Sequence, residues 1–145
     1  MLHLFTYGTL QPGQRNAHLL TPFASSHQRA TCAGWQLWHL QAPHNYPAII
    51  QGQLEDIIHG TLFSFEESLT TDILRRCDHL EEFDPCDPEK SLYLRQLTKV
   101  SVLNSPHPVD AHIYIWNPVH TQVLRSQHIQ VQDGNWASYI SQHAE

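Results

Sequence analysis

The chain has 145 residues, which is the size of one compact domain, and 14 acidic against 8 basic residues give it a formal net charge of −6. So few basic residues, with no lysine- or arginine-rich block, argue against a nucleic-acid partner. No apolar run approaches the roughly 20 residues that a membrane-spanning helix needs, so no membrane partner is expected either. We expect residues 1–145 to form a single domain.

The cysteines and histidines point to no special chemistry. Cys32, Cys77 and Cys86 are odd in number and include no Cys-x-x-Cys pair, so a disulfide framework is not expected. The twelve histidines are scattered and lack metal-ligand spacing, so we expect no metal and no cofactor. Because the N-terminus begins with a strand-like pattern instead of a basic and apolar leader, a cytoplasmic location is expected.

The first element is the alternating run of residues 2–7, which predicts a β-strand with one buried face. The run breaks at Tyr7–Leu10 and passes into a Pro-Gly turn. Gly8 has no Cβ, so it suits a sharp turn or a close approach to a ligand. We therefore expect a loop whose backbone N–H groups bind an anion or a carbonyl oxygen. An ordinary turn is the alternative interpretation.

The middle of the chain is rich in strand patterns. Residues 14–23 favour a short helix, and residues 31–40 are typical of a strand with large aromatic anchors. Two prolines and an asparagine predict irregular structure at 42–47. Residues 54–65 indicate a strand pair or a bent strand, with Gly60 at a bulge or a barrel corner.

The second half predicts two helices and a hairpin. Residues 68–82 have helical periodicity, and residues 83–90 form a loop rich in proline and aspartate. Residues 92–103 and 109–116 are expected to pair as an antiparallel hairpin, and 136–143 form a C-terminal helix. Together the elements predict an α+β fold, a small, mixed and partly closed β-barrel with a few peripheral helices.

One carboxylate in the predicted helix lies on its apolar face. A rotation of about 100° per residue places Glu81 inside a continuous apolar arc. The arc is formed by Ile73, Leu74, Cys77 and Leu80. Desolvation and the negative end of the helix dipole both favour the protonated acid, so we expect Glu81 to have a raised pKa and to transfer protons. If the helix ends earlier, Glu81 is an ordinary surface acid.

Two segments carry a resemblance to a known family. The opening run Phe5-Thr-Tyr-Gly-Thr-Leu-Gln-Pro-Gly-Gln-Arg-Asn16 resembles the start of the gamma-glutamylcyclotransferase-like family, and most closely its gamma-glutamylamine cyclotransferase branch. The predicted helix resembles the family segment Leu-Asp-x-x-Glu-Gly-Tyr, with the match on Asp78 and Glu81. This chain departs from that segment at Glu82, where glycine is common.

Further matches follow in the family's order along the chain. They are Tyr46-Pro47-Ala48, Tyr93-x-Arg95, the strand around Tyr114, and Gly134-Asn135-Trp136. The resemblance implies that Glu81 is the catalytic acid/base. It implies substrate binding by Tyr7, Gly8, Thr9, Leu10, Tyr46, Pro47, Tyr93, Arg95 and Tyr114. A structural ion pair of Arg95, and packing of Tyr93 opposite it, are equally open interpretations.

The resemblance also implies a reaction. A small gamma-glutamyl compound would be cyclised to 5-oxoproline, with release of an amine or amino acid, by an acyltransferase- or lyase-type enzyme. The nucleophile would be the substrate's own α-amine, which agrees with the lack of a Gly-x-Ser-x-Gly motif and of a Cys-His cluster. The alternatives are a related lyase acting on a larger gamma-glutamylated compound and a non-catalytic small-molecule binding module that retains the pocket.

Overall fold

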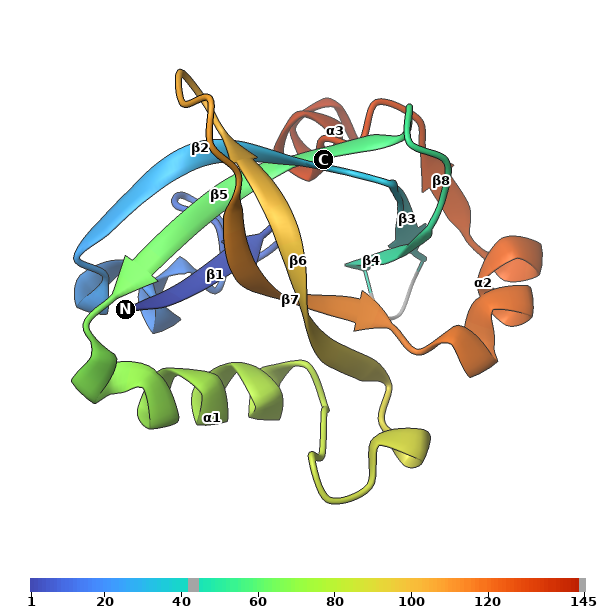
Figure 1. The fold of residues 1–145 in the computed structure, drawn as a ribbon. Coiled ribbons are helices and arrows are strands. Elements are labelled where there is room, and N and C mark those ends of the chain that lie inside the picture. Colours follow the sequence, from blue (N-terminus) through green and yellow to red (C-terminus); the bar gives the residue numbers. More distant parts are fainter. Residues whose placement is uncertain (42–44, 144–145) are drawn as a thin grey trace.

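The computed structural model describes residues 1–41 and 45–143, and these ranges form a closed barrel beside a smaller sheet. The barrel has the strand order β1-β5-β2-β6-β7, and the second sheet has the order β4-β3-β8 (Figure 1). The barrel strands are β1 (Leu2–Thr6), β2 (Ser26–Ala33), β5 (Ile57–Phe65), β6 (Tyr93–Val102) and β7 (Val109–Trp116). The other strands are β3 (Trp35–Leu40), β4 (Tyr46–Gln51) and β8 (Ile129–Val131). The predicted α+β barrel is confirmed, and the barrel is fully closed.

The barrel closes through its first and last strands. Neighbouring strands pair antiparallel except β1 and β7, which meet in a parallel pairing at Leu4 and His112. The predicted hairpin is the β6–β7 pair. Gly60 lies where β5 passes close to β1, since a Cβ at this position would be 2.1 Å from the carbonyl oxygen of Thr6. Glycine therefore permits the tight contact between these two strands.

Three α-helices lie outside the barrel in the described ranges. They are α1 (Thr70–Leu80), α2 (Thr121–Gln127) and α3 (Trp136–His143). Figure 1 shows α1 along the bottom of the molecule and α3 at the top, behind β2 and β5. The sequence predicted α1 and α3, but neither α2 nor β8. The predicted helix at 14–23 is instead two 3₁₀ turns, because Pro22 has no N–H to continue a helical ladder.

The predicted strand at 31–40 is wrong as a single element. Gly34 adopts a φ of 94°, and this left-handed residue turns the chain from β2 in the barrel to β3 in the second sheet. The prediction of irregular structure at 42–47 is also wrong at its end, because β4 begins at Tyr46. Residues 42–44 lie outside the described residues. Pro47 is tolerated because β4 pairs with β3 alone and its other edge needs no N–H.

Strand β1 is buried on both faces, whereas the sequence predicted one buried face. Leu4 packs in one apolar cluster with Ile73 and Cys77 of α1. Phe5 packs on the opposite face in a second cluster with Ile58. β1 therefore connects the core under α1 to the core of the barrel, and the residues that follow it emerge between the two.

Candidate active site

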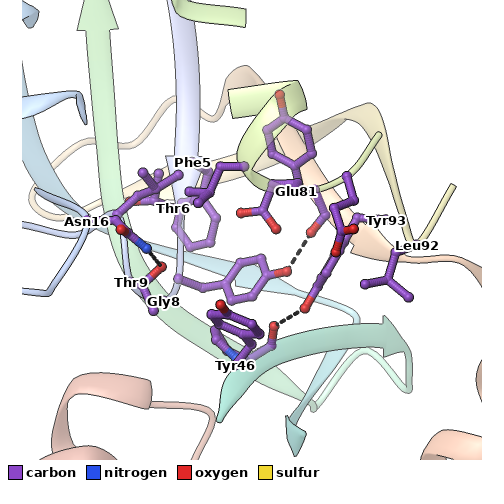
Figure 2. Close-up of a pocket in the computed structure, with 15 residues that line it drawn as sticks. Phe5, Thr6, Gly8, Thr9, Asn16, Tyr46, Glu81, Leu92 and Tyr93 are labelled. Atoms are coloured by element: carbon purple, nitrogen blue, oxygen red, sulfur yellow. Dashed lines mark hydrogen bonds between the residues drawn. The ribbon is translucent and has the colours of Figure 1, made fainter. Parts of the chain in front are cut away.

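A cavity of about 130 Å³ lies beyond the end of β1, beside the C-terminal end of α1. This is about ten times the space that one water molecule occupies by the same measure, so a small organic molecule fits. Its lining is Phe5, Thr6, Tyr7, Gly8, Thr9, Leu10, Asn16, Tyr46, Pro47, Leu80, Glu81, Glu82, Leu92, Tyr93 and Tyr114. In Figure 2 the Glu81 carboxylate points into this space, between the loop with Thr9 and Asn16 and the strand with Tyr93.

The loop wall of the cavity, Tyr7–Leu10, is held by hydrogen bonds within the N-terminal segment. The N–H of Gln11 donates to the carbonyl of Gly8 at 3.2 Å, and the N–H of Asn16 donates to the carbonyl of Thr9 at 2.9 Å. The Asn16 side-chain amide also donates to the Thr9 hydroxyl at 2.9 Å. A Cβ on Gly8 would lie 2.2 Å from Cγ of Pro47, so this wall depends on glycine for its contact with β4.

The helix wall begins where α1 ends. Glu81 is the C-terminal cap of α1, and its N–H still donates to the carbonyl of Cys77 at 2.9 Å. The N–H groups of Glu82 and Phe83 donate to the carbonyls of His79 (3.3 Å) and Asp78 (2.9 Å). This pattern is a Schellman motif, and Glu82 occupies its left-handed position with a φ of 52°. Glu82 thus stands where the backbone favours glycine, which is the departure seen in the sequence.

Burial raises the pKa of Glu81 to about 8. Its side chain is partly exposed because it lines the cavity, but the surrounding protein replaces most of its water. None of the hydrogen bonds within residues 1–41 and 45–143 involves its carboxylate. Among the described residues no hydrogen bond offsets the cost of desolvating the charge, so a pKa of about 8 favours the protonated acid at neutral pH.

Two tyrosine hydroxyls lie close to Glu81 and are fixed in direction. Burial raises the pKa of Tyr7 and of Tyr93, and the nearby Glu81 carboxylate raises both further. The Tyr7 hydroxyl donates to the carbonyl of Tyr114 at 2.6 Å, and the Tyr93 hydroxyl donates to the carbonyl of Pro47 at 2.7 Å. Since each hydroxyl uses its proton in this way, its oxygen is left to accept a hydrogen bond from a bound molecule.

The structure brings together all the predicted site residues except Arg95. The guanidinium of Arg95 contacts both carboxylate oxygens of Asp78, at 2.6 and 2.7 Å, and Arg95 does not line the cavity. Tyr114 lines it, but its hydroxyl donates to the same Asp78 at 2.5 Å. The lining residues that the sequence did not predict are Phe5, Thr6, Asn16, Leu80, Glu82 and Leu92. Asn16 stands in the opening motif, where its spacing from Thr9 was a usable signal.

The neighbouring groups offer no metal site and no reactive thiol. Burial raises the pKa of the Cys77 thiol, which lies one turn before Glu81, to about 12. In the part of the chain that the structure describes, no three His, Cys, Asp or Glu side chains are placed to hold a metal ion. Over the same residues, no helix has the length and apolar character to cross a membrane.

Comparison with known proteins places the chain in a family. Residues 4–138 match the family model for gamma-glutamyl cyclotransferase, AIG2-like. The chain belongs to this family. No curated protein matches it in sequence.

Solved structures share the gamma-glutamyl cyclotransferase-like fold at low identity. YkqA from Bacillus subtilis is 20% identical with a TM-score of 0.67, and the match covers 99% of this chain but only 43% of YkqA. An AIG2-like protein from Mus musculus is 23% identical (TM-score 0.62; 79% of this chain and 76% of that one). A structure titled gamma-glutamyl cyclotransferase is 17% identical (TM-score 0.58; 80% and 66%). At these identities the likeness establishes the fold alone.

Proposed function

We propose that this family member is an active cyclotransferase that converts a small gamma-glutamyl compound to 5-oxoproline, with Glu81 as general acid/base. The observation that carries the proposal is the Glu81 carboxylate, which faces the Tyr7–Leu10 loop across the cavity and whose pKa burial raises to about 8. An acid with a pKa near the working pH both accepts and returns a proton, and a binding module has no use for it.

The reaction is an intramolecular aminolysis. Glu81 takes a proton from the substrate's α-ammonium, and the freed amine attacks the γ-carbonyl carbon of the same molecule. A C–N bond closes the five-membered ring, the original γ-amide C–N bond breaks, and Glu81 returns its proton to the departing nitrogen. The attacking nitrogen also loses a second proton as it becomes the ring amide, and the released amine takes up this proton. The products are 5-oxoproline and an amine that leaves as an ammonium ion, and no water or other reactant is consumed.

The protein's main tasks are to fold the substrate and to stabilise charge. The cavity walls would bring amine and carbonyl together, which is a proximity effect. We assign the backbone N–H groups of Tyr7–Leu10 to the substrate carboxylate or the developing oxyanion. The Tyr7 and Tyr93 oxygens accept hydrogen bonds from the ammonium, and Tyr46, Pro47 and Tyr114 complete the walls. The positive ammonium also lowers the pKa of Glu81 when it binds, which produces the base form.

We further propose the gamma-glutamylamine branch for the substrate and a single domain for residues 1–145. The form of the Tyr7–Leu10 loop supports the first, because it resembles the opening of that branch. The interleaving of the two sheets along the chain supports the second, since β3 and β4 lie between barrel strands in sequence.

The test is a screen of gamma-glutamyl amines and gamma-glutamyl dipeptides for release of 5-oxoproline. We expect turnover by the native protein, faster with the amines, and a loss of about 10²–10⁴-fold in Glu81→Gln, which keeps the size but not the titrating proton. The matched control is Glu67→Gln, because Glu67 is an exposed acid next to α1 whose carboxylate pairs with the N-terminal amine, away from the cavity. A Glu81→Gln variant with wild-type rate would refute the mechanism, and native protein without turnover would favour the binding module.

A further inference from the structure

Three side chains from three elements meet behind the cavity. Asp78 comes from α1, Arg95 from β6 and Tyr114 from β7, and they are called the Asp78 network below. Arg95 and Tyr114 lie directly opposite each other in the β6–β7 ladder, so both reach the same carboxylate. Asp78 and Arg95 are largely buried, with side-chain exposures of 13% and 20%. A charge-assisted pair in such surroundings has a strongly preferred geometry.

The network is connected to the opposite wall of the cavity through Tyr114. Its hydroxyl donates to Asp78, and its backbone carbonyl accepts the hydrogen bond of the Tyr7 hydroxyl at 2.6 Å. A continuous chain of contacts therefore runs from the Tyr7–Leu10 loop, through β7, to the last turn of α1. Tyr114 thus connects the two walls.

The network also holds the chain on both sides of Glu81. Asp78 precedes Glu81 by three residues, and Phe83 follows it by two. The guanidinium of Arg95 bonds Asp78 and lies 5.5 Å from the centre of the Phe83 ring, within the range of a cation–π contact. Glu81 itself makes no described side-chain hydrogen bond, so its direction depends on the backbone that Arg95 secures at either end.

We propose that the Asp78 network is a positioning device that aims Glu81 at the Tyr7–Leu10 loop, with Arg95 and Tyr114 as positioning residues that do not touch the substrate through their polar groups. This inference rests on the proposed function of Glu81. Of the two interpretations of Arg95 that the sequence left open, it favours the structural ion pair over the substrate-binding role that the resemblance implied. It also gives different tasks to the two carboxylates at the end of α1. Asp78 is held by two hydrogen-bond donors, and Glu81 is left free to exchange its proton.

Removal of Arg95 would also change the charge near Glu81. The titratable and charged groups that face Glu81 or the Asp78 network are Tyr7, Tyr46, Arg76, Cys77, Asp78, Glu82, Tyr93, Arg95, His112 and Tyr114. Arg95 offsets the negative charge of Asp78, which lies one helical turn from Glu81. Burial is the cause of the raised pKa of Glu81 in the native chain, and an uncompensated charge on Asp78 would add to that shift.

Two single variants and one double variant test the proposal. In Arg95→Gln we expect kcat to fall about 100-fold, with a smaller change in KM, because a displaced catalytic group loses near-attack geometry. In Tyr114→Phe, which keeps the ring and the carbonyl, we expect a loss of about tenfold. The titration midpoint of Glu81, measured by NMR on a ¹³C-labelled carboxyl, should rise by about one unit in Arg95→Gln. The double variant Asp78→Asn/Arg95→Gln should restore the midpoint but not kcat.

The matched control is Lys99→Gln. It breaks the exposed Lys99–Asp110 pair across the same two strands and should leave both kcat and the Glu81 midpoint unchanged. Wild-type kcat in Tyr114→Phe, together with an unshifted midpoint in Arg95→Gln, would overturn the positioning role. If the native protein turns over no gamma-glutamyl compound, the proposed function fails, but the Glu81 midpoints of the same variants still support or overturn the network.

Discussion

The two walls of the cavity are built in opposite ways. In the loop wall, Tyr7–Leu10, the polar side chains of Tyr7 and Thr9 have hydrogen-bond partners, and Gly8 fits closely against Pro47. In the helix wall, Glu81 has a desolvated carboxylate without a described partner, and Glu82 holds a left-handed backbone without being glycine. Under the proposed function this difference corresponds to a division of tasks, in which the rigid wall would bind the substrate and the wall that carries strain and desolvation would react.

The largest expected effect concerns the stability of the helix wall. Because the folded-state pKa of Glu81 is raised to about 8, the folded chain keeps a proton that the unfolded chain releases above about pH 4.5. The contribution of Glu81 to the free energy of unfolding is therefore fully present below about pH 4.5 and is lost as the pH rises through about 8. In urea unfolding, the free energy of unfolding of the wild type should fall by on the order of 3–5 kcal/mol between these two pH values. The Glu81→Gln variant should not show this fall.

The control for this measurement is Glu82→Gln, which neutralises the adjacent acid and should keep the wild-type pH slope. Equal slopes in Glu81→Gln and wild type would mean that the helix wall carries no unusual carboxylate. The contrast between the two walls would then be lost.

The next effect concerns catalysis. In the proposed mechanism Glu81 must be ionised to accept the ammonium proton, so kcat/KM should rise with pH up to about 8, by about 50-fold from pH 6 to 8. When the substrate is bound, its ammonium group favours the ionised carboxylate of Glu81. The rise of kcat with pH should therefore end at a lower pH than the rise of kcat/KM. Steady-state rates of 5-oxoproline release across this range check both. If the rise of kcat/KM with pH ended near pH 4.5 instead, Glu81 would behave as an ordinary acid.

A smaller effect tests the rigidity of the loop wall. Gly8→Ala places a Cβ about 2.2 Å from Cγ of Pro47, so the loop or β4 must shift, at a cost of about 1–3 kcal/mol. KM should rise more than kcat falls, because the binding wall moves and Glu81 does not. Gly13→Ala is the control: it has a φ of 83° but no atom within 4 Å, so it costs about 1 kcal/mol of strain and leaves KM unchanged. Equal effects of the two substitutions would contradict a fitted loop wall.

The smallest effect is a stabilisation. Glu82→Gly relieves the left-handed strain at the end of α1 and should raise the unfolding free energy by about 1 kcal/mol. Glu82→Gln removes the charge but keeps the Cβ, so comparison of the two in urea separates backbone strain from the helix dipole. An unchanged free energy in Glu82→Gly would remove the evidence for strain in the helix wall.

Local signals alone placed Glu81 and the Tyr7–Leu10 loop among the cavity-lining residues, whereas Tyr46, Pro47, Tyr93 and Tyr114 came from the family resemblance. The apolar arc of residues 73–80 placed Glu81 toward the core, and the glycine at position 8 marked a close approach. Arg95 was different, because its partner Asp78 lies on another element and nothing in a strand's own pattern reveals which face of a helix it will meet. The pairing depends on how α1 crosses β6 and β7, which is a tertiary property.

The fold shows the same limit. The hairpin and α1 follow from periodicity and were predicted. The division of 31–40 depends on the positive φ of Gly34, and a glycine after an alternating run looks the same whether the strand continues or turns. β4 was missed because Pro47 was taken as a strand breaker, although an edge strand accepts it. Strand β8 is three residues long and is specified by its partner β3 more than by its own sequence.

The burial of the cysteines has a practical consequence. Cys32 and Cys77 are buried, and burial raises the pKa of each thiol, whereas Cys86 is exposed in the loop that follows α1. A maleimide dye added to the folded native chain should therefore attach at Cys86 alone, without any engineered substitution. Fluorescence from that position would report movement at the end of α1 as ligand enters the cavity.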